Sequence, residues 1–211
     1  MDMQFYGADC IVLSSKQNRI VIDDNLAALN AKSVTKDGDI CLFTAAGEHP
    51  AVSAKPKLTI DTPGEYEVSN ISIFGLQTRA HMDEEDRKTA VMYKVTWGET
   101  RALIVGHAFP KLTEDQLESI GIVDVMFVPV GGNGYTLDAT GALQLIKAVE
   151  PKIVIPTHYD DPHLSYEVPQ IGLEDALRTL GMEPKERIGK FQFKTADATD
   201  TTQLVVLEPA K

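Results

Sequence analysis

The fold of this chain is decided by residues 122–157, which read IVDVMFVPVGGNGYTLDATGALQLIKAVEPKIVIPT. The stretch opens and closes with nearly continuous apolar runs, which are typical of strands buried on both faces. Between these runs a helix is predicted from near Asp138, with Leu143 and Ile146 on its apolar side and Pro151 at its end. A buried strand, a helix and a second buried strand in this order indicate a layered α/β (α+β) protein.

Upstream of this unit the chain reads as short strands separated by tight turns. The strands predicted there cover residues 8–15, 18–24, 39–43, 57–60, 66–76, 90–97 and 101–106. The last two are joined by Gly98 and Glu99, a two-residue link in which glycine supplies the positive φ of a type II′ turn. We therefore expect this half of the chain to form antiparallel strands.

Helices and strands alternate in the rest of the chain. The residues 113–121 begin with Thr113 and carry Gln116 three positions later, which is the pattern of a helix capping box. A further helix is predicted over residues 173–181, and closing strands over residues 190–195 and 203–209. Strands followed by helix-strand units predict two packed sheets with helices on their outer faces.

Length and composition predict a single globular domain over residues 1–211, with 43% hydrophobic and 24% charged residues. No apolar run reaches the ~18 residues that a membrane-spanning helix requires. The start of the chain, MDMQFYGADC, has no basic segment before an apolar one, so we expect a cytoplasmic protein without a secretory signal. The two cysteines, Cys10 and Cys41, stand beside strand residues and are interpreted as buried thiols.

The charge balance argues against nucleic-acid partners. The chain has 31 acidic and 20 basic residues, and the difference gives a formal charge of -11 that repels phosphate backbones. The chain contains no G-x-S-x-G elbow, no G-x-x-x-x-G-K-[ST] loop and no G-x-G-x-x-G. The expected partner is a small molecule, and a homo-oligomer is left open.

Three spaced motifs resemble the metallo-β-lactamase-fold hydrolases. They are PVGG at 129–132, YTLD at 135–138 and PKIVIPTHY at 151–159, within a segment 103–160 that is similar to the C-terminal half of that family. The branch that it resembles most includes predicted zinc-dependent hydrolases such as ascorbate-phosphate lactonase. Further similarity lies in residues 3–24, 62–76 and 79–93. The resemblance implies a four-layer αββα sandwich of the metallo-β-lactamase type.

The metal-binding loop of that family is degenerate in this chain. Members hold one or two metal ions with a His-x-His-x-Asp-His loop, and CLFTAAGEHP, residues 41–50, stands at the place of this loop. Ala45 and a second small residue, Ala46 or Gly47, replace the first two histidines, whereas Glu48 and His49 match the Asp-His end. A two-metal site is therefore disfavoured.

Three other histidines fall at family metal positions. His81 matches a further histidine, His107 replaces the bridging aspartate, and His158 matches the final histidine. The Gly-His that members carry near the N-terminus is altered to Gly7 and Ala8.

The resemblance implies one divalent metal held among Glu48, His49, His81, His107 and His158. Zinc is favoured, with manganese or iron as alternatives, and three protein ligands would leave a position for water. His107 is predicted to serve as a fourth ligand or a proton shuttle, and His81 to face the substrate.

Two functions follow from this site. The first is a single-metal hydrolase of a small ester, lactone or phosphoester that uses a metal-bound water. The second is a catalytically inactive pseudoenzyme, without metal, that binds a ligand or partner in the same cleft.

Overall fold

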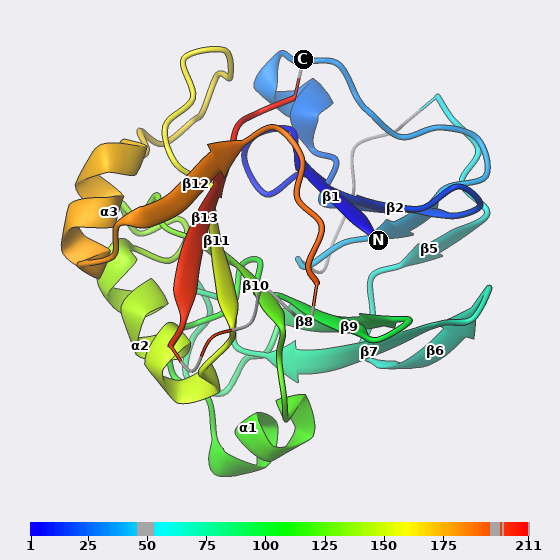
Figure 1. Ribbon diagram of the computed structural model, residues 1–211. Coiled ribbons are helices and arrows are strands. Elements are labelled where there is room, and N and C mark those ends of the chain that lie inside the picture. Colours follow the sequence, from blue (N-terminus) through cyan, green and yellow to red (C-terminus); the bar gives the residue numbers. More distant parts are fainter. Residues whose placement is uncertain (46–52, 195–198, 200, 211) are drawn as a thin grey trace.

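The structure, a computed structural model, describes residues 1–45, 53–194, 199 and 201–210. Two β-sheets form its centre (Figure 1). The smaller sheet has the order β1-β2-β3-β4-β5, with β1 Asp2–Phe5, β2 Ile11–Ser14, β3 Arg19–Ile22, β4 Ile40–Leu42 and β5 Leu58–Ile60. The predicted α/β (α+β) class with two sheets is confirmed.

The larger sheet has the order β12-β13-β11-β10-β9-β8-β7-β6. Its strands are β6 Gly64–Val68, β7 Ile71–Thr78, β8 Ala90–Trp97, β9 Thr100–Ile104, β10 Val125–Pro129, β11 Ile153–Thr157, β12 Pro184–Ile188 and β13 Gln203–Leu207. Strands β6 to β9 form an antiparallel meander, and β9, β10, β11, β13 and β12 run parallel to one another. The apolar runs on either side of the helix are the central strands β10 and β11, which are buried along their whole length.

Three α-helices lie on the face of the larger sheet that is turned away from β1 to β5 (Figure 1). They are α1 Glu114–Ile120, α2 Ala139–Val149 and α3 Leu173–Leu180. Local signals set their starts. Thr113 and Gln116 form the predicted capping box, and the Asp138 carboxylate accepts a hydrogen bond of 2.7 Å from the backbone N–H of Gly141. No helix in the described part of the chain has the length and apolar character needed to cross a membrane.

On the smaller sheet, a short 3₁₀-helix packs against part of the strands. The 3₁₀-helix η1, Leu26–Leu29, follows β3, and Leu26 packs with Cys10, Val12 and Val21 in a small apolar cluster. Both cysteines are buried and free, as predicted. The main core lies between the two sheets and under the helices.

Three sequence expectations about strands were wrong. The strand predicted over 66–76 is the hairpin β6-β7, because Ser69 and Asn70 both adopt positive φ, 54° and 60°, and turn the chain. The smaller sheet is not wholly antiparallel, because β4 pairs in parallel with both β3 and β5. Parallel pairing depends on the route of the connecting segments and leaves no mark in the strands themselves.

The closing strand expected over 190–195 is also misplaced. In its described part, residues 190–194, only Phe191 pairs, through an isolated bridge to Met3, and its ring is buried in the core. The strand next to β13 is instead β12, whose sequence PKERI is too polar to show the apolar alternation of a strand. An edge strand with exposed side chains can have this composition because little of it is buried.

Candidate metal centre

Three side chains from separate loops converge at the ends of their strands. Asp9 lies in the turn between β1 and β2, His107 follows β9, and His158 follows β11. Their ligand atoms all lie within 4.8 Å of one another. One carboxylate and two imidazoles at this spacing form a donor set that a divalent transition metal uses.

Asp9 is held in a tight turn with one carboxylate oxygen unused. Gly7 and Ala8 both adopt positive φ, 106° and 48°, and the backbone N–H of Cys10 returns to the carbonyl of Gly7 at 2.8 Å. The Asp9 Oδ1 accepts a hydrogen bond of 2.8 Å from the Thr157 hydroxyl, whereas the buried Oδ2 has no partner among the described residues. Buried carboxylate oxygens are nearly always satisfied, so a free one beside two imidazoles fits a metal ligand.

His158 is fixed with one ring nitrogen available. Its backbone N–H donates to the carbonyl of Ala8 at 2.7 Å, and its Nδ1 lies 3.2 Å from the Oε1 of Gln170. The Gln170 Nε2 donates to the carbonyl of Val168, which leaves its oxygen facing the imidazole. Nδ1 therefore carries the proton and Nε2 the lone pair. Burial lowers the pKa of His158, so the ring is neutral at pH 7.

His107 is oriented by a second pair of side chains. Its Nδ1 lies 3.1 Å from the Thr44 hydroxyl, which is itself 2.6 Å from the Oδ2 of Asp23. The hydroxyl donates to the carboxylate, so it accepts from the N–H at Nδ1, and the lone pair of His107 is again at Nε2. Burial raises the pKa of Asp23 to about 6, and the hydrogen bonds that Thr44 donates to its carboxylate oppose that rise.

Two glycines permit these close approaches. A Cβ on Gly106 would stand 2.2 Å from the Thr44 hydroxyl oxygen, and one on Gly131 would stand 2.0 Å from the backbone oxygen of His158. No side chain fits at either position without moving Thr44 or His158, so both glycines are steric requirements of the site.

A cavity of about 280 Å³ opens over the three ligands. Tyr135 lies at its mouth with 44% of its surface exposed, and its ring centroid is 6.1 Å from His107 and 5.9 Å from His158. The Tyr166 ring lies 5.6 Å from His158, and its hydroxyl donates to the carbonyl of Tyr159. This cavity is large enough for a small molecule only.

The structure places only some of the predicted site residues in the three-residue group. The structure brings together His107 and His158, whereas Glu48 and His49 lie outside the described residues. His81 is not a member of the three-residue group; its backbone N–H donates to the carbonyl of His107, and its buried Nδ1 has no partner within the described chain. Its roles as ligand and substrate contact stay predictions. His163 lies outside the group, with an exposed side chain beside Asp161.

Sequence reasoning missed Asp9. Asp9 falls at the beginning of the predicted strand 8–15, and Gly7 and Ala8 before it stand where family members carry a Gly-His pair. The available signal was an acidic residue directly after a glycine turn and before a buried strand, at the same place in the chain as the altered Gly-His pair.

Comparison with known proteins identifies the superfamily of this chain. A family model described as the beta-lactamase superfamily domain matches residues 2–158. A stretch of 70 residues is 39% identical to a UPF0173 metal-dependent hydrolase of Carboxydothermus hydrogenoformans and covers 33% of this chain. Another of 47 residues is 43% identical to a UPF0173 metal-dependent hydrolase of Thermoplasma acidophilum and covers 21% of this chain. These stretches span only 30% and 20% of the two relatives' own lengths.

Solved structures resemble the whole chain. A proposed Zn-dependent hydrolase of the metallo-β-lactamase superfamily from Thermotoga maritima superposes with a TM-score of 0.77 at 23% identity, over 98% of this chain and 97% of that chain. Igni18, a metallo hydrolase from the archaeon Ignicoccus hospitalis, superposes with a TM-score of 0.64 at 16% identity, over 100% and 96% of the two chains. At these identities the superpositions establish a shared fold.

Proposed function

Because this chain belongs to the beta-lactamase superfamily, we propose that it is a hydrolase of small esters or lactones with one divalent metal at Asp9, His107 and His158. The observation that carries the proposal is the convergence of these three side chains, with the Asp9 Oδ2 unpartnered and both imidazoles holding their protons at Nδ1. Zinc is the proposed metal because two imidazoles and a carboxylate suit it, and manganese and iron accept the same donors.

A bound divalent ion would supply Lewis acidity, polarising a substrate carbonyl and lowering the pKa of water. The chain supplies the orientation. Gln170 fixes the ring of His158, and Thr44 fixes the ring of His107. Each imidazole therefore keeps its Nε2 lone pair in a fixed orientation, available to a metal ion. Ligands that are oriented in advance lose little freedom on binding the ion, which favours affinity.

A protein group at the cavity can also hydrogen-bond to the substrate. In ester hydrolysis the acyl C–O bond breaks, the oxygen of water joins the acyl carbon, and a proton passes to the leaving alcohol. Tyr135 stands at the mouth beside both imidazoles, and burial raises the pKa of its hydroxyl, so the hydroxyl stays protonated at neutral pH. It can donate a hydrogen bond to a substrate oxygen in the cavity.

Metal content tests the proposal directly. Tag-free protein is analysed by inductively coupled plasma mass spectrometry beside the variants Asp9→Asn, His107→Gln and His158→Gln. About one ion per chain is expected in the parent and a strong loss in each variant. His163→Gln is the matched control, because this exposed histidine lies outside the cluster and should keep the ion.

The opposite result separates the proposal from its alternative. A parent protein that binds no zinc, manganese or iron after reconstitution would contradict the hydrolase. That outcome would favour a pseudoenzyme that uses the same cavity for binding alone.

A further inference from the structure

The charges around the cavity bear on which substrate it accepts. The described residues that line it include three carboxylates, Asp9, Asp23 and Glu167, and no lysine or arginine. Among the described lining residues, three negative charges and one divalent ion sum to -1, so this described lining stays negative with its metal bound.

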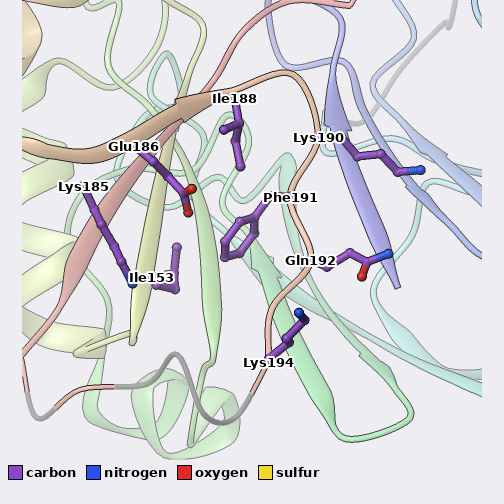
Figure 2. A pocket seen from close by; sticks show the side chains of 8 residues that line it. All are labelled: Ile153, Lys185, Glu186, Ile188, Lys190, Phe191, Gln192 and Lys194. Carbon is purple, nitrogen blue, oxygen red and sulfur yellow. The ribbon is translucent and has the colours of Figure 1, made fainter.

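Basic side chains line other hollows of the same protein. A hollow of about 560 Å³ lies beside β12, and its lining residues include Lys185, Lys190 and Lys194 (Figure 2). A third, of about 920 Å³, includes Arg19 and Arg187 among its lining residues. The absence of basic residues from the described lining of the metal cavity is therefore a local property of that cavity.

Tyrosines reinforce the effect of the carboxylates. Tyr135 and Tyr166 both line the cavity, and aromatic rings attract cations through their negative faces. Glu167 is exposed at the mouth and directly follows Tyr166 in the chain. A cationic group entering here would meet two aromatic rings and a carboxylate, whereas a phosphate or sulfonate would meet a negative field without a basic partner.

We propose that this site prefers carboxylic esters and lactones with a positively charged or neutral group and disfavours anionic substrates, including phosphoesters. The inference rests on the proposed function and narrows its substrate class. At about 7 Å in water a unit charge changes binding by about threefold, so a cationic and an anionic substrate of equal shape should differ by about tenfold at a site of net charge -1.

Three acetates of similar shape test the selection. They are the 4-trimethylammonio, 4-tert-butyl and 4-sulfo derivatives of phenyl acetate, assayed at pH 8 and low salt with metal-loaded protein. After division by the uncatalysed rate, kcat/KM should fall in the order cation, neutral, anion. Bis(4-nitrophenyl) phosphate, which is also an anion, should give a kcat/KM no higher than that of the sulfonate. The corresponding acetanilides, which keep the charges but resist hydrolysis, give a binding order by calorimetry.

Two variants test whether the charge of the cavity lining causes the expected preference for cationic over anionic substrates. Glu167→Gln should reduce the cation-to-anion ratio about tenfold, in both the rate and the binding assays. The control Glu118→Gln makes the same change on an exposed residue of α1 that does not line the cavity, and it should leave the ratio unchanged.

The two proposals fail in different ways. If metal-loaded protein hydrolyses none of the three acetates, the proposed function fails, and the acetanilide series still ranks the charges. The charge selection is overturned if the sulfonate binds as tightly as the cation, if none of the acetanilides binds, or if Glu167→Gln leaves the ratio unaltered.

Discussion

Replacing Thr44 by valine should loosen the metal site and destabilise the fold through one lost hydroxyl. Valine keeps the shape of threonine, so the change removes only the hydroxyl oxygen that lies 2.6 Å from Asp23 and 3.1 Å from His107. A hydrogen bond to a buried charged group contributes about 1.5–3 kcal/mol, and one to a neutral imidazole about 1 kcal/mol. The backbone N–H of Thr44 still donates to the Asp23 Oδ1, so the carboxylate keeps one partner. We expect a loss of about 3 kcal/mol in the free energy of unfolding.

Urea denaturation of the metal-free protein measures this loss, with Thr44→Ser as the matched control. Serine keeps the hydroxyl and removes one buried methyl, which should cost only about 1 kcal/mol. The affinity for Zn²⁺, measured by calorimetry, should fall by about 10- to 100-fold in Thr44→Val and change little in Thr44→Ser, because His107 would lose its orienting partner. Equal unfolding free energies and equal Zn²⁺ affinities in the two variants would refute the reasoning.

Three further predictions concern the same site. Burial raises the pKa of Asp23 from its ordinary 3.8 to about 6, so the folded state holds this proton more tightly than the unfolded state. The free energy of unfolding of the metal-free protein should therefore fall by about 3 kcal/mol as the pH rises from about 4 to 6, and urea denaturation of Asp23→Asn should show no such fall. Gly131→Ala would place a methyl 2.0 Å from the backbone oxygen of His158 and should lower the melting temperature by several degrees and reduce bound metal, whereas Gly189→Ala, with open space around it, should do neither. His81→Gln should lower kcat with metal content unchanged if His81 faces the substrate, and a loss of the metal would instead identify it as a ligand.

Helix starts and buried strands could be predicted where residues close together in the sequence determine them. The capping box at Thr113, the cap at Asp138 and the buried runs that became β10 and β11 depend on residues a few positions apart, so the sequence displays them. The split of residues 66–76 into β6 and β7 was missed, because the turn needs positive φ at both Ser69 and Asn70, and serine, unlike asparagine, seldom adopts that conformation.

The sequence by itself determined the class of fold, the family resemblance and the placement of His107 and His158 at the ends of buried strands. Tertiary structure alone decided that Asp9 joins them. Its carboxylate meets Thr157 across 148 positions of sequence, and no periodicity or spacing reports a contact of that length. Such contacts depend on how the two sheets pack, because packing brings the β1-β2 turn against the end of β11. The lining of the cavity was also decided by tertiary structure, because Glu167 comes to line it beside His158 only through the folding of the chain.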